Sequence, residues 1–254
     1  MRNLNIIFTL IILINLFSGC SKDNEPQNNM IDSYFYGYMD YENYATSPNA
    51  INVKLIYENG KVIKRVGDML ISPYFPTITT DSIYDEITYI NNEIHIVKKS
   101  NFWIMNPNER IIYLDNQQRM LKMIDYQTNT GFDKTIYEYD SKGLLLKSTT
   151  ILDLRKDTIF THYYFNSSSN LDSIVTYSIE NPLYKRVIVL SDYDNHINPM
   201  KHLFLFKETF NRSLSKNNYR QKEIKEITDN QLFIHNIFKN SFPYDSNGNP
   251  IFSK

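Results

Sequence analysis

The sequence predicts a mainly β fold: an antiparallel meander of sequential hairpins, with one short helical or loop interruption near residues 199–217. Three observations predict it. Tyr (20) and Phe (15) are abundant while Gly (7) is scarce, and aromatic and β-branched residues favour strands. Short runs of alternating apolar residues recur along the chain, and polar turn sequences separate them at nearly regular intervals.

The turn sequences are the clearest local signal. Asn59-Gly60 lies between two apolar-alternating runs, which is a strong hairpin signal. Further turns begin at Asp115, Asp140, Asn166 and Asp194, with gaps of 25, 26 and 28 residues. Asp or Asn at the first position of a turn can accept hydrogen bonds from its own backbone. A spacing in this range indicates one hairpin unit per repeat.

Two of these units carry a resemblance to known proteins. Residues 139–144 (YDSKGL) and 244–250 (YDSNGNP) resemble YD-type repeats, which occur in Rhs-like shells and in Bacteroidota lipoproteins of the DUF4595 kind. Asn198-Pro199 and the stretch 215–218 (SKNN) match a loop that interrupts the hairpins in such lipoproteins. The resemblance covers roughly residues 51–254. It implies a β-meander of hairpins and no established activity.

Residues 199–217 interrupt the hairpin rhythm. Apolar side chains at helical spacing predict a loop with one helical turn or a short helix here: Leu203, Phe204, Phe206, Phe210 and Leu214. Residues 30–50 are expected to form an edge strand or an ordered lead-in. We expect residues 31–254 to form a single β-rich domain.

The N-terminus predicts a lipoprotein. Arg2 precedes an apolar run over residues 6–17, which is shorter than the roughly 20 residues of a membrane-spanning helix. Residues 17–20 (FSGC) resemble the bacterial lipobox, with Phe17 where Leu is usual. The resemblance implies that residues 1–19 are a signal peptide and that Cys20 receives a diacylglyceryl anchor. The alternative is an ordinary secretory signal with an incidental cysteine.

Residues 20–30 are polar after the lipidated Cys20 and predict a flexible tether. Ser21 beside the cysteine resembles lipoproteins sent to the outer membrane. The order of Lys22, Asp23 and Glu25 resembles the surface-export signal of Bacteroidota lipoproteins. The expected location is therefore the outer membrane, facing the cell surface. Because Cys20 is the only cysteine, an intramolecular disulfide is excluded.

Composition and motifs narrow the function classes. Lys and Arg (27) balance Asp and Glu (28), so the chain lacks the basic surface that nucleic-acid binding needs. No phosphate-binding glycine loop and no G-x-S-x-G motif is present. Among the five histidines only His196 and His202 are close in sequence, and any zinc site would need His and carboxylate ligands alone. We therefore predict no catalytic residues, no metal site and no cofactor.

Two residue classes leave an alternative open. Acid pairs such as Asp85-Glu86, or Asp153 with Asp157, are candidates for glycoside hydrolysis only by abundance, and solvated surface is the simpler interpretation. A set of aromatic residues could form a sugar-stacking platform: Tyr34, Phe35, Tyr36, Tyr38, Tyr41, Tyr44, Phe102 and Trp103. Packing on one face of a sheet explains such alternation more simply, as it does for Tyr137 and Tyr139.

The sequence thus leads to three hypotheses. The first is a non-enzymatic binding or structural module of the cell envelope, held to a membrane through its lipid. The second is a glycan-binding or glycan-hydrolysing surface protein, which an open aromatic groove would favour. The third is a protein partner of a secreted toxin, suggested only by the Rhs resemblance.

Overall fold

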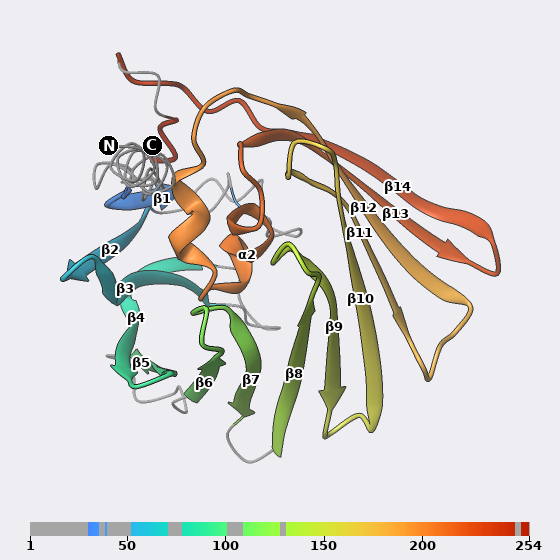
Figure 1. Cartoon of the computed structure of the whole chain (residues 1–254), viewed down its shortest axis with the longest axis horizontal. Helices are drawn as coiled ribbons and strands as arrows, with labels where there is room; N and C mark the ends of the chain where they lie inside the picture. The colour runs from blue at the N-terminus through green and yellow to red at the C-terminus, as the bar shows by residue number, and fades with distance from the viewer. Residues whose placement is uncertain are drawn as a thin grey trace, which may run out of the picture.

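The computed structural model describes residues 30–35, 39, 52–70, 78–100, 109–127, 131–246 and 250–253. These residues form one antiparallel sheet of fourteen strands in strict chain order. Figure 1 shows that the sheet curls and that a short helical segment lies on its concave side. Within the described residues, no pairing joins the two edge strands, β1 and β14, so the sheet is open.

The strands and helices have the following bounds: β1 Ser33–Phe35, β2 Asn52–Glu58, β3 Lys61–Leu70, β4 Ile78–Ile90, β5 Glu93–Ser100, β6 Glu109–Leu114, β7 Met120–Gln127, β8 Gly131–Tyr139, β9 Leu145–Leu152, β10 Asp157–Phe165, β11 Leu171–Ser178, β12 Tyr184–Tyr193, the 3-10 helix η3 Pro199–Leu203, the α-helix α2 Lys207–Ser213, β13 Tyr219–Thr228 and β14 Gln231–Lys239. The predicted meander is therefore confirmed, as is the helical interruption within 199–217. Among the described residues, no helix has the length and apolar character needed to cross a bilayer.

The regularly spaced turns share one geometry. Oδ1 of Asp140 accepts hydrogen bonds from the backbone N–H groups of Lys142 and Leu144, both at 2.8 Å. The N–H of Asp140 donates to the carbonyl of Leu144 at 2.9 Å. Asp115 and Asn166 make the equivalent bonds two and four residues onward. The fourth turn residue has a positive φ in each case, namely Gln118, Gly143 and Ser169.

The helical segment is an insertion into this same turn. Asp194 begins the next turn, and its Oδ1 accepts from the N–H of His196, two residues onward, at 3.1 Å. The second N–H that this oxygen accepts from belongs to Asn218, and the N–H of Asp194 donates to the Asn218 carbonyl. Asn218 therefore takes the position that Leu144 has in the shorter turn. The residues between carry η3 and α2 without disturbing the β12–β13 hairpin.

Tyrosines at the ends of four strands tie hairpins to earlier parts of the chain. The hydroxyl of Tyr139 donates to the carbonyl of Met120 at 2.9 Å, and that of Tyr89 donates to the carbonyl of Val62 at 3.1 Å. Tyr57 and Tyr193 donate in the same way to Ile31 and Leu171. Burial raises the pKa of Tyr57, Tyr89 and Tyr139 to about 12, so each hydroxyl stays a donor. At the turns that begin at Asp140 and Asp194, the preceding tyrosines Tyr139 and Tyr193 thus help to fix the packing of successive hairpins.

Apolar packing and one buried amide hold the inserted segment against the sheet. Met200, Leu203, Leu205 and Phe206 belong to the same buried cluster as the inward side chains of the strands. Oδ1 of Asn198 accepts from the N–H of Met200, while its Nδ2 donates to carbonyls at the end of α2 and just after it. A buried amide with all of these bonds satisfied fixes both ends of the insertion.

Candidate ligand-binding site

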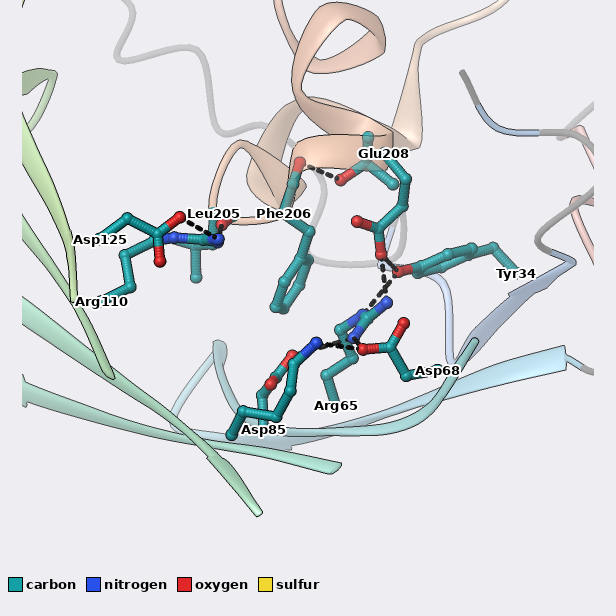
Figure 2. Close-up of polar contacts among 11 residues, drawn as sticks. Tyr34, Arg65, Asp68, Asp85, Arg110, Asp125, Leu205, Phe206 and Glu208 are labelled. Atoms are coloured by element: carbon teal, nitrogen blue, oxygen red, sulfur yellow. Dashed lines mark hydrogen bonds and ion pairs between the residues drawn. The ribbon is translucent and has the colours of Figure 1, made fainter. Parts of the chain in front are cut away.

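A buried ion cluster connects the insertion to the sheet. Arg65 on β3 is 3% exposed. Its Nη1 lies 2.9 Å from Oδ2 of Asp85 on β4, and its Nη2 lies 2.5 Å from Oε1 of Glu208 on α2. The hydroxyl of Tyr34 donates to the same Glu208 oxygen at 2.6 Å (Figure 2). Asp68 is also close to Arg65 and pairs with Lys98. Since Arg65 on β3 is paired with carboxylates from β4 and from α2, the cluster is suited to holding α2 in place.

A second charged group lies on the other side of the Phe206 ring (Figure 2). Arg110 on β6 donates to Oδ2 of Asp125 at 3.2 Å and to the carbonyl of Leu205 at 3.2 Å. Lys207 at the start of α2 lies 2.8 Å from the same Asp125 oxygen. Burial alone would raise the pKa of Asp125, but the charges of Arg110 and Lys207 outweigh burial and hold this pKa below its ordinary value. Asp125 is therefore an anion shared by two cations.

Next to this group, a cavity of about 300 Å³ lies between the insertion and strands β7–β10. We call it the tyrosine cavity. Its apolar lining includes Met120, Met123, Phe204, Phe210 and the rings of Tyr137 and Tyr163. Its polar lining includes Arg110, Asp125, Asp133, Thr135, Ser148, Thr150 and Thr161. An apolar pocket with a few converging polar groups is the usual form of a small-molecule site.

The strand register brings the polar lining together. Thr135 pairs with Thr150 across β8 and β9, and Tyr137 pairs with Ser148 one step along. Side chains two residues apart on a strand share a face, so all four lie on the concave side of the sheet. The hydroxyl oxygens of Thr135 and Thr150 are 3.0 Å apart. Those of Ser148 and Tyr163 are 3.2 Å apart.

Tyr137 is the most unusual group in the cavity. Its side chain is nearly buried, and among the described residues its hydroxyl has only the sulfur of Met123 as a partner, at 4.0 Å. Thioether sulfur is a weak acceptor. Burial raises the pKa of Tyr137 far above its ordinary value, and the nearby Tyr163 adds to that rise while Arg110 opposes it. The hydroxyl therefore remains a protonated donor at any physiological pH.

Two acids line the cavity, and Asp125 is committed to two cations. Asp125 lies directly opposite Asp133 across β7 and β8. Hydrolysis by two carboxyl groups needs one of them to remain protonated as the general acid. The pKa of Asp125 is held low, and its Oδ2 is occupied by Arg110 and Lys207. Asp125 is therefore not available as the general acid.

The residues named from the sequence are placed as follows. Tyr34 and Phe35 are buried, and the Tyr34 hydroxyl belongs to the Arg65 cluster, so these two rings pack in the core instead of forming a platform. Tyr36, Tyr38, Tyr41, Tyr44, Phe102, Trp103 and Cys20 lie outside the described residues. Tyr137 lies in the cavity, while Tyr139 is the hairpin tie described above.

The polar candidates from the sequence are not brought together. Asp85 is committed to Arg65, while Glu86 is half exposed near Lys99. Asp153 lies in the β9–β10 turn with Lys156, and Asp157 accepts from the N–H groups of Thr158 and Glu180. His196 packs on the ring of Tyr244. Within the part of the chain that the structure describes, no three His, Cys, Asp or Glu residues group as metal ligands.

The sequence did not indicate Arg65 and Glu208 of the ion cluster, or Arg110, Asp125 and Tyr163 of the cavity lining. Four of them lie on different strands and the fifth lies on the insertion, so no spacing in the sequence connects them. One signal was available, because Phe204, Phe206 and Phe210 already indicated an apolar face that needed a partner. The sheet supplies that partner, and Phe210 packs against Tyr137 and Tyr163 with ring centroids 5.9 and 6.3 Å apart.

Comparison with known proteins adds information on the fold. No family model and no curated protein matches the chain. Among solved structures, a porin-like protein from Bacteroides uniformis matches with a TM-score of 0.52 at 8% identity, over 81% of this chain and 83% of that chain. A porin-like protein from Bacteroides vulgatus matches with a TM-score of 0.46 at 13% identity, over 81% of this chain and 86% of that chain. At such identities the likeness concerns the fold alone.

Proposed function

We propose that this chain is a lipid-anchored protein of the bacterial cell envelope that binds a small ligand, without catalysis, in the tyrosine cavity. The buried Tyr137 hydroxyl carries the proposal. A buried donor without a strong acceptor costs free energy, so a site that keeps one is suited to receive a ligand oxygen. The low pKa of Asp125 and its pairing with two cations support binding over hydrolysis.

The anchor is the second part of the proposal. The FSGC sequence at residues 17–20 and the polar stretch that follows support lipidation of Cys20. Ser21 and the order of Lys22, Asp23 and Glu25 support delivery to the outer membrane, facing outward. The repeated Asx turn and the insertion after Asp194 support kinship with YD-type Bacteroidota lipoproteins. In this arrangement the membrane is a partner through the lipid, and the cavity is carried on a tether.

The anchor is tested by labelling cells with a palmitate analogue. The wild-type chain should be labelled and the Cys20→Ala variant should not. Ser21→Ala is the matched control, since it changes the adjacent residue and leaves the thiol, and it should be labelled like wild type. Labelling of Cys20→Ala equal to that of wild type would exclude a lipid on this residue.

The binding site is tested by NMR of methionine methyl groups in the mature chain, residues 20–254, with Cys20→Ser in place of the lipid. Met120 and Met123 line the cavity, while the buried Met200 lies in η3 and serves as an internal reference. The probes are soluble saccharides, alkyl carboxylates and alkyl alcohols. At least one probe class should shift Met120 and Met123 at concentrations that leave Met200 unchanged.

Two variants on neighbouring positions sharpen this test. Thr150→Phe fills the cavity, whereas Thr149→Phe places the same ring on the opposite face of β9. The methyl shifts should disappear in the first variant and persist in the second. If no probe class shifts either methionine of the wild-type chain, the proposed function is wrong.

Glycan binding is the second candidate function, and the hydroxyl groups of Thr135, Thr150 and Ser148 are the observation that favours it. Sugar binding usually also uses an open aromatic face. Here the rings of Tyr137 and Tyr163 are packed against Phe210. The saccharides in the same screen decide between the two ligand classes.

A further inference from the structure

The tyrosine cavity contains hydroxyl protons that have no oxygen partner among the described residues. Tyr137 is 7% exposed, and its hydroxyl contacts only the Met123 sulfur at 4.0 Å among the described residues. A phenol inside a protein normally donates to an oxygen. Satisfying this group requires an oxygen that these residues do not provide.

Two pairs of hydroxyl groups provide further protons that are available to donate. Thr135 and Thr150 share one hydrogen bond, as do Ser148 and Tyr163. In each pair one hydroxyl donates to the other, so the second hydroxyl still has a proton to donate. The cavity therefore holds one further available O–H for each pair, beside the one on Tyr137.

Arg110 supplies a charged donor at the same place. Its two Nη atoms donate to Leu205 and Asp125. Its Nε is buried and has no hydrogen-bond partner in the described part of the chain. The charges of Asp125 and Arg110 act on the Tyr137 hydroxyl in opposite directions, the effect of Arg110 being the larger, and both Arg110 and Tyr137 line the cavity. An oxygen between them would accept from a phenol and stand next to a guanidinium.

The charged groups that line the cavity are Arg110, Lys207, Asp125 and Asp133. Asp125 serves both cations at once through one oxygen. Arg110, Asp125 and Asp133 lie in one register row across β6, β7 and β8, whereas Tyr137 is four residues further along β8. At roughly 3.4 Å per residue, the Tyr137 backbone is about 14 Å along the strand from this row, and Arg110 has a longer side chain than either acid in it.

The apolar lining is suited to a chain more than to a sugar ring. The ring of Tyr137 meets Phe210 at an interplanar angle of 49°, and that of Tyr163 meets it at 75°. These contacts leave no pair of parallel aromatic faces for a flat ring to enter. Met120 and Met123, which are flexible and unbranched, complete the lining and can follow the shape of an acyl chain.

We infer that the tyrosine cavity binds a monocarboxylate with an unbranched apolar chain. The carboxylate accepts from Tyr137 and from the free hydroxyls of the two pairs, and the chain lies along Met120, Met123 and Phe210. A carboxylate provides about four acceptor positions, which matches this set of donors better than an alcohol does. The inference deepens the proposed function and rests on it.

The experiment titrates the mature chain carrying Cys20→Ser with octanoate, decanoate, decanol and decyl maltoside, using the Met120 and Met123 methyl signals. Each methylene buried contributes about 0.8 kcal/mol, so decanoate should bind roughly fifteenfold more tightly than octanoate. Decanol should bind at least tenfold more weakly than decanoate, because it cannot accept from several donors at once.

Tyr137→Phe removes the hydroxyl and keeps the ring. It should weaken decanoate binding by about tenfold or more and decanol binding by less than threefold. Tyr164→Phe is the matched control, since Tyr164 is half exposed on the other face of β10 and should leave both affinities unchanged. Should Tyr137→Phe fail to fold, Thr150→Val removes one hydroxyl pair at constant shape and should weaken decanoate binding about threefold.

Three other outcomes would contradict the inference. Equal affinities for decanol and decanoate would overturn the carboxylate assignment. Methyl shifts with saccharides but not with decanoate would also overturn it, while leaving a ligand site in this cavity. Shifts with no probe at all would overturn both the inference and the proposed function, because the cavity would then hold water only.

Discussion

Arg65 and Glu208, 143 positions apart in the sequence, form a buried ion pair with 2.5 Å between Nη2 and Oε1. The pair joins the third strand to the only α-helix among the described elements. Asp85, Asp68 and Tyr34 complete the contacts around the guanidinium. The helix lies on the concave side of the sheet. This pair therefore helps to hold in place the segment that closes one side of the tyrosine cavity.

Removing the charge of Glu208 tests that role. Glu208→Gln keeps the side-chain shape but leaves Arg65 with one carboxylate fewer in a buried place. Breaking a buried pair typically costs about 3–5 kcal/mol, and the free energy of unfolding in urea should fall by that order. Glu138→Gln is the control, because Glu138 is mostly exposed beside Lys147 and its change should cost less than about 1 kcal/mol.

The repeated turn predicts a local effect. Asp140→Ala removes the acceptor of two backbone N–H groups, and the free energy of unfolding should drop by about 1–2 kcal/mol. Ser141→Ala, at the exposed next position, should change it by less than about 0.5 kcal/mol. Equal stabilities of the two variants in thermal unfolding would contradict the structural role of the Asx turn.

The local stability of the inserted segment should depend on the Asn198 side chain. Asn198→Ala deletes three buried hydrogen bonds, two from its Nδ2 and one to its Oδ1. Hydrogen exchange measured by mass spectrometry should show faster exchange across residues 199–213, with strands β8–β10 still protected, since the sheet does not pass through this residue. The exposed neighbour variant Asn195→Ala should leave exchange in the segment unchanged.

The pairing of Asp125 predicts a dependence of stability on pH. Its pKa in the folded protein lies below the ordinary value of 3.8, so the folded state favours the anion. The stabilisation is fully present above the ordinary pKa, and it is lost as the pH falls through the lowered one. The stability difference between wild type and Asp125→Asn should therefore be largest near pH 7 and should shrink toward pH 3.

Urea unfolding of both chains at pH 7 and pH 3 measures this difference. Asp172→Asn, at an exposed position on β11, is the control and should show no such trend. A difference that grows at low pH would mean that Arg110 and Lys207 do not stabilise the Asp125 anion.

The sequence by itself determined the class of fold and the local structure. Asp115, Asp140 and Asn166 specify their turns through bonds to neighbours two and four residues away, and such bonds depend only on nearby chain. Alternation of apolar residues then orders the strands, since consecutive hairpins pair with each other. The lipobox at Cys20 is likewise a local motif, and it stays a prediction.

Tertiary structure alone decided the site. The curl of the sheet and the docking of the insertion bring Arg110, Asp125, Tyr137 and Tyr163 to one cavity, although 53 positions separate the first from the last. The same docking brings Glu208 into contact with Arg65. Such contacts depend on strand curvature and on which helix face meets the sheet, and neither of these is encoded by residue spacing within one element.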